Sequence, residues 1–149
     1  MVLTPFEKRI ALSKLLGLGF GLVFAWWLAQ MTAAPVTLIW GVALWLITLG
    51  AMIGILGFCT RLPLFGFALP VWLRGAWCGL WMGIVMVLLA YGPLSAAIDQ
   101  MTWLPSMFHS PWWALVDMAI IGAVIDLIAT RITGPLTWPG PGVSGYSEA

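Results

Sequence analysis

Three charged residues interrupt long apolar stretches of this sequence, and their side chains could support chemistry. They are Arg74, Asp117 and Asp126. A charged side chain in hydrocarbon costs roughly 2.5–3.5 kcal/mol on insertion scales, so such residues are functional candidates by default. Arg74 begins one apolar run and Asp126 lies near the end of another. Antiparallel neighbouring helices would bring the two residues to similar depth, which predicts an Arg74–Asp126 ion pair.

Asp117 lies near the other end of the run that contains Asp126, about 9 Å inside it at 1.5 Å per residue. The connections at that end contain no lysine or arginine, so the carboxyl group must be protonated, hydrogen-bonded or facing water. Positions 117 and 126 differ by nine, which is about 180° around a helix. The two carboxylates therefore cannot both face one narrow pore, although Asp117 alone could couple transport.

Residues that bind metals or act as nucleophiles are scarce. His109 is the single histidine, and we expect an ordinary hydrogen-bonding residue, with metal or tetrapyrrole ligation as the alternative. Cys59 and Cys78 fall at the cytoplasmic ends of two spans, where free thiols are expected. This set is too small for a protein-bound zinc site, and no hydrolase, protease or nucleotide-binding motif occurs. We therefore predict no metal, no cofactor and no enzymatic activity.

The elements that position these residues are predicted to be four transmembrane helices. The chain is 62% hydrophobic and 7% charged, whereas ordinary soluble domains carry about 25% charge. A helix needs roughly 20 apolar residues to span a bilayer. The sequence thus predicts an all-α integral membrane protein, a four-helix bundle over residues 1–133 with spans near 10–30, 36–58, 71–91 and 111–130. A Pro/Gly-rich cytoplasmic tail is expected over residues 134–149.

The basic residues predict the orientation. All six lie in segments that alternate with uncharged or acidic ones, so they fall on one side of the membrane: Lys8, Arg9, Lys14, Arg61, Arg74 and Arg131. Basic loops stay in the cytoplasm, which places both termini there. We expect an uncleaved first span and a bacterial inner membrane. A net charge of +1 gives no basic surface for nucleic acid.

Prolines and caps predict where the helices begin. Pro5, Pro35, Pro70 and Pro111 each stand at the head of an apolar run, where a missing N–H does no harm. Thr4 and Glu7 have the spacing of a capping box, and Ser110 is a candidate N-cap. Within residues 92–110, apolar spacing predicts a short interfacial helix.

Small and aromatic residues predict how the helices pack. Glycines repeat at intervals of four, and this spacing lets backbones approach closely: Gly17 and Gly21, Gly50 and Gly54, and Gly75, Gly79 and Gly83. The partner of each face is either a helix of the same chain or another subunit. Most tryptophans map to the membrane interfaces, but Trp45, Trp77 and Trp81 fall deeper. We expect these three to pack against helices or lipid, with a bound lipid, quinone or pigment as the alternative.

Three functions are compatible with these features. The first is a non-catalytic membrane subunit that stabilises a larger membrane complex, or a homo-oligomer. The second is a small transporter or channel component that uses Asp117, with Arg74 and Asp126 as an inner pair. The third is a lipid-modifying membrane enzyme that uses Asp126 and the basic residues. We favour the first because no catalytic cluster is present.

Overall fold

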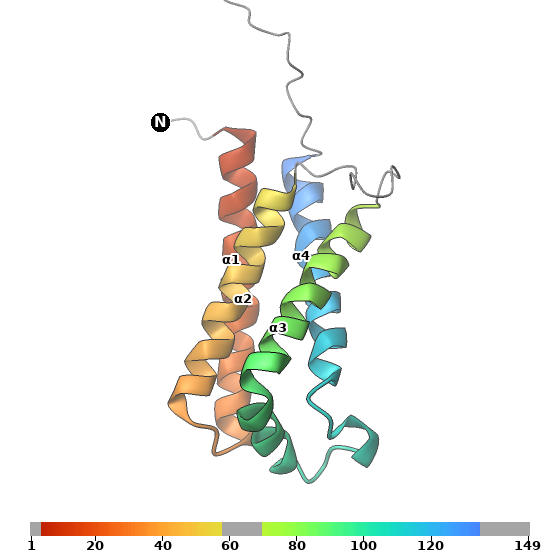
Figure 1. The fold of residues 1–149 in the computed structure, drawn as a ribbon. Helices are drawn as coiled ribbons and strands as arrows, with labels where there is room; N and C mark the ends of the chain where they lie inside the picture. The colour runs from red at the N-terminus through yellow and green to blue at the C-terminus, as the bar shows by residue number, and fades with distance from the viewer. Residues whose placement is uncertain (1–3, 58–69, 135–149) are drawn as a thin grey trace, which may run out of the picture.

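The computed structural model describes residues 4–57 and 70–134. This described part is all-helical and contains no strand. Its long helices are α1 (Pro5–Met31), α2 (Val36–Leu56), α3 (Val71–Asp99) and α4 (Trp113–Thr133), with a short 3₁₀ helix, η1 (Ser106–Phe108) (Figure 1). Within the described ranges, four helices are long and apolar enough to cross a membrane. Cys59, Arg61 and the tail from residue 135 lie outside the described residues.

The predicted helix starts are largely confirmed. Thr4 caps α1, and the Thr4–Glu7 capping box is complete, with the Thr4 backbone N–H donating to Glu7 Oε2 at 2.8 Å. Pro35 and Pro70 occupy the N-cap positions of α2 and α3. The fourth helix begins at Trp113 rather than at Pro111, because Pro111 and Trp112 form a turn before it.

The third helix differs most from expectation. It runs on to Asp99 instead of ending near residue 91, and it has a kink at Ala90, where φ is −122° and ψ is 23°. Pro93 has no N–H to donate to the carbonyl of Leu89, which accounts for a break at this point. The segment of α3 beyond the kink, up to Asp99, corresponds to the short helix predicted for this region.

The four helices form two antiparallel hairpins, α1 with α2 and α3 with α4, and each hairpin is packed most closely within itself (Figure 1). The start of α1 and the end of α4 lie at the same end of the bundle, with the end of α2 and the start of α3. We call this the basic end, because Arg9, Arg74 and Arg131 lie there. The opposite end, with the loop that carries His109, is the His109 end.

Glycines make the close approach inside each hairpin. A Cβ at Gly17 would overlap the carbonyl oxygen of Leu46, and one at Gly50 would overlap that of Ser13. A Cβ at Gly21 or Gly54 would likewise lie under 3 Å from the backbone of Ala43 or Ile10, so both glycine pairs serve the α1–α2 contact.

The three glycines of α3 serve the α3–α4 contact in the same way. A Cβ at Gly79 would overlap the carbonyl oxygen of Met118, and one at Gly75 would overlap that of Gly122. Gly122 is a reciprocal small residue that the sequence analysis did not single out. The glycine faces therefore pack against helices of the same chain. Their spacing alone did not show whether the partner was a helix of the same chain or another subunit.

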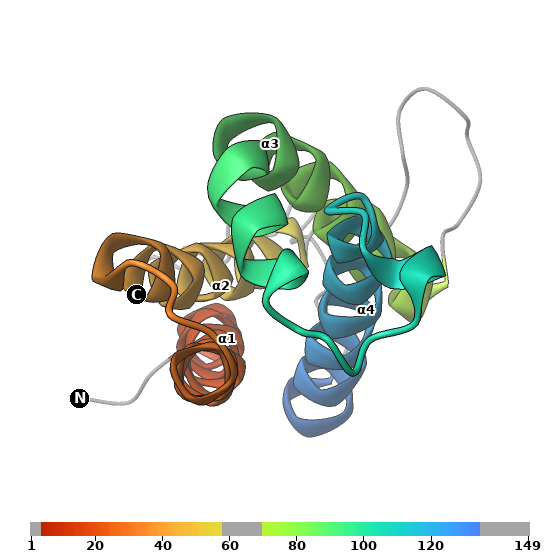
Figure 2. The ribbon, with the colours of Figure 1, turned by 90° about the horizontal axis from the view of Figure 1, so that it is seen from below.

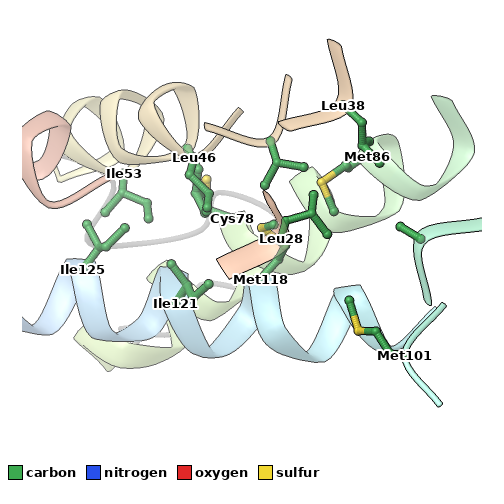
Figure 3. Packing of buried hydrophobic residues seen from close by; sticks show 13 residues of the cluster. Leu28, Leu38, Leu46, Ile53, Cys78, Met86, Met101, Met118, Ile121 and Ile125 are labelled. Carbon is green, nitrogen blue, oxygen red and sulfur yellow. The ribbon is translucent and has the colours of Figure 1, made fainter. Parts of the chain in front are cut away.

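Apolar side chains pack together between the two hairpins. Leu46 and Ile53 of α2 face Ile121 and Ile125 of α4 (Figure 3). Leu46 and Ile125 have no exposed surface. Cys78 lies in the same cluster as a buried free thiol, as expected for that residue.

Candidate functional site

The main polar site is a charge cluster at the basic end, centred on Asp126. Arg74 binds this carboxylate with two hydrogen bonds, from Nε to Oδ2 and from Nη2 to Oδ1, both 2.9 Å. The Arg74–Asp126 ion pair predicted from depth is therefore present in the structure. Arg9 Nη2 also donates to Asp126 Oδ1. We use the name charge cluster for Arg9, Arg74 and Asp126.

Arg9 is the member that the sequence analysis missed. It was counted among the basic residues of the membrane surface, but its side chain is fully buried, as is that of Asp126. Its Nη1 donates to Thr130 Oγ1 at 3.0 Å. The sequence contains a pattern that would have predicted the burial of Arg9. Arg9 precedes Ser13, Gly17 and Gly21 at intervals of four, so it lies on the same inward face of α1.

The end of α2 completes the cluster. The carbonyl of Gly57 accepts a hydrogen bond from Arg74 Nη1 at 3.1 Å. A Cβ at Gly57 would overlap the guanidinium of Arg9, so glycine is needed for this close approach. One group of side chains and one backbone carbonyl thus join all four long helices at one point.

This geometry favours a structural role for the cluster over a catalytic one. Both oxygens of Asp126 accept hydrogen bonds from arginines, so the carboxylate is not free to act as a base or nucleophile. Arginine stays charged in proteins and cannot serve as a proton donor here. Within the described residues, Arg9 Nε and Ser13 Oγ are buried there without a hydrogen-bond partner. Among the described residues, no group of three acidic, histidine or cysteine side chains could hold a metal ion.

Asp117 lies far from this cluster, toward the His109 end of α4. Its side chain is exposed, in contrast to that of Asp126, as the opposite helix faces predict. Within the described residues, its carboxylate has no hydrogen-bond or ion-pair partner. It lines a cavity of about 460 Å³ between the two hairpins.

The His109 side chain contacts the backbone of the loop to which it belongs. Its Nε2 lies 3.0 Å from the carbonyl oxygen of Leu104, at hydrogen-bonding distance. In the same loop, Trp113 Nε1 donates to the carbonyl of Met107 at 2.8 Å. Gln100 Oε1 accepts from the backbone N–H of Ala33, which ties this end of α3 to the α1–α2 connection.

The three deep tryptophans have different surroundings. Trp77 and Trp81 point away from the bundle, 59% and 62% exposed, on the face of α3 opposite its glycines. Trp45 of α2 is partly buried against the core, and its Nε1 is buried with no hydrogen-bond partner in the part of the chain that the structure describes. It lines a second, smaller cavity of about 290 Å³ beside Pro93.

Comparison of the chain with known proteins does not identify a family. No protein-family model, no curated protein and no solved structure matches the chain. The class that the fold defines is an all-helical protein with four helices able to span a membrane.

Proposed function

We propose that this chain is a non-catalytic integral membrane subunit that packs against and stabilises a larger membrane protein complex. The exposed tryptophan pair on α3 carries this proposal. Trp77 and Trp81 lie about 9 and 15 Å along α3 from Val71, at 1.5 Å per residue. In a hydrocarbon layer ~30 Å thick, Trp81 is then near the middle.

Indole is usually found at the headgroup level, where its N–H finds a polar partner. Within the described residues, neither Trp77 nor Trp81 makes a hydrogen bond. A neighbouring membrane helix would cover both rings and could offer a carbonyl or hydroxyl to their N–H groups. Because the glycine faces are already filled inside the chain, this tryptophan face is the surface proposed for the partner.

The absence of free catalytic groups in the charge cluster supports the same proposal. Asp126 forms ion pairs with both arginines, and these pairs link α1 and α3 to α4. The proposal includes an orientation with both termini in the cytoplasm, supported by the positions of Lys8, Lys14 and Arg131 at the basic end. It also includes a bacterial inner membrane as the location.

Mild-detergent extraction from the native membrane tests the proposal. Wild-type chain should migrate with other membrane proteins in a complex well above its own 16.2 kDa. The variant Trp77→Ala/Trp81→Ala should lose that complex while keeping the unfolding transition of the isolated chain. Trp26→Ala is the matched control, because Trp26 is 66% exposed on a different helix.

Two results would contradict this proposal. One is a wild-type chain that migrates alone or only with copies of itself. The other is a complex that survives the double tryptophan substitution unchanged.

A transporter or channel component is the second candidate, and the unpaired Asp117 beside a cavity favours it. In this alternative Asp117 is the coupling site, while Arg74 and Asp126 form an inner barrier. Asp117→Asn should then abolish solute or proton flux in vesicles that contain this chain alone. If no flux is found with the wild-type chain, the alternative fails.

A further inference from the structure

The cavity beside Asp117 has the composition of a ligand site. It lies at the His109 end, where α1 and α4 are separated and the loop after α3 passes between them (Figure 2). At the basic end the same two helices are held together by Arg9, Asp126 and Thr130. The hairpins are therefore joined at one end and leave an open cavity between them at the other. A volume of about 460 Å³ falls in the usual range for small-molecule pockets.

The walls of this cavity are almost entirely apolar. All four long helices contribute to them, and aromatic rings come from Phe24, Trp27, Phe108 and Trp113. Trp113 already donates its N–H to Met107, and Phe108 packs on its ring at 4.8 Å between centroids. These contacts hold the Trp113 and Phe108 rings in place. The four rings together can surround an apolar body or present a ring face to a cation.

Among the described residues that line this cavity, Asp117 is the one acidic or basic side chain. Its carboxylate has no partner among the described residues, and the described lysines and arginines lie toward the other end of the bundle. The hydroxyl of Ser110 is the other polar side-chain group besides the indoles. A negative group in an apolar, aromatic space selects a ligand that brings a positive hydrogen-bond donor together with apolar surface.

We propose that this cavity binds an apolar molecule that bears an ammonium group, with the ammonium on Asp117 and the apolar body among the aromatic rings. Two sources share this chemistry: a free membrane-dissolved amine and the aminoethyl headgroup of a lipid. The site is independent of the tryptophan face of α3, so it does not depend on the subunit proposal.

Binding to the full chain in phosphatidylcholine nanodiscs tests the proposal. The probes are 2-(1-naphthyl)ethylamine and 2-(1-naphthyl)ethanol, which differ only in the amino group. After subtraction of uptake by empty nanodiscs, wild-type protein should bind the amine saturably and at least about tenfold tighter than the alcohol, as expected for a charged hydrogen bond. Asp117→Asn should reduce this preference to less than about twofold.

Asp99→Asn is the matched control. Asp99 is an exposed carboxylate at the same end of the bundle, at the end of α3, and it does not line the cavity. The control should keep the full preference for the amine. Asp117→Asn breaks no hydrogen bond among the described residues, so its unfolding transition should match wild type and show that lost binding is not lost folding.

Repeating the measurement with phosphatidylethanolamine in the nanodiscs distinguishes the two sources. Weaker binding of the probe by several-fold would identify the lipid headgroup as a competitor, whereas unchanged binding would identify a site for free amines. The proposal is overturned if wild-type protein binds both probes equally or neither saturably. It is also overturned if Asp117→Asn keeps the preference, or if Asp99→Asn loses it to the same extent.

Discussion

At the scale of single residues, Asp126 holds the bundle together at its basic end. It is buried, and its two arginine partners come from α1 and α3. A buried charge whose partner is removed is left without compensation, which typically destabilises a protein by about 3–5 kcal/mol. The stability of the fold should therefore depend on this group of residues more than on any surface charge.

The pair between Arg74 and Asp126 can be tested by a double-mutant cycle. We expect Asp126→Ala to lower the free energy of unfolding by roughly 3–5 kcal/mol, because it leaves two arginines without their carboxylate. Arg74→Ala should cost less, because Arg9 still pairs with Asp126. The double variant should lose clearly less than the sum of the two. Unfolding in mixed detergent micelles is the measurement, with exposed Arg131→Ala as a control that changes little. Strictly additive losses would contradict the contact.

Arg9 gives a second test at this scale, because its neighbour Lys8 is exposed. Arg9→Met removes the contacts to Asp126 and Thr130 and should lower stability by an amount similar to Arg74→Ala. Lys8→Met removes the same charge from the surface and should have little effect. If the two variants unfold alike in the same micelle assay, Arg9 does not belong to the cluster.

The sequence was informative about part of this site. Matched depth was enough to predict the Arg74–Asp126 pair, because charges in apolar helices need partners. Arg9 was missed because the positive-inside pattern assigns a basic residue near the first span to the surface. Because the first helix begins at Pro5, Arg9 lies within it. The spacing of Arg9 from Gly17 and Gly21 then places its side chain on the inward face of the helix. The contribution of Gly57 depends on tertiary contact and has no signal in the sequence.

At the scale of elements, the fold depends on backbone contact inside each hairpin. Lipid removes the hydrophobic force between helices, so close packing at small residues takes its place. The four-residue spacing of glycines predicted these faces. Apolar runs and prolines predicted most helix starts, since Pro35 and Pro70 directly precede α2 and α3. The kink of α3 was not predicted, because the third span was expected to end near residue 91 and a separate loop to follow it.

Gly79→Leu tests the packing of α3 on α4. A side chain at Gly79 meets the carbonyl of Met118, which is backbone and cannot move aside cheaply, so the hairpin should open or fail to fold. We expect a loss of several kcal/mol in the free energy of unfolding, in the range of severe overpacking.

Gly19→Leu is the matched control for this test. Gly19 is a helical glycine with no atom within 4 Å of an added Cβ. Its substitution should change stability little in the same detergent titration. Equal behaviour of the two variants would contradict the close contact between α3 and α4.

At the scale of the whole molecule, the number of apolar helices was predictable from the sequence but the cavity between them was not. Apolar runs of about 20 residues set the four helices almost independently of one another. The cavity beside Asp117 exists because α1 and α4 meet at the basic end and separate toward the His109 end. That separation results from the packing of all four helices together, so no local pattern in the sequence encodes it.

The orientation of the whole molecule is the last prediction. Basic residues at one end of the bundle predict that this end faces the cytoplasm, with Asp99 on the other side. In a chain whose Cys59 and Cys78 are replaced by alanine, Asp99→Cys should react with a membrane-impermeant maleimide in intact bacterial cells. Ser147→Cys should react only after the cells are opened, which also shows that its thiol is reactive. Labelling in the reverse order would place the charge cluster at the outer surface, where it could not follow the positive-inside rule.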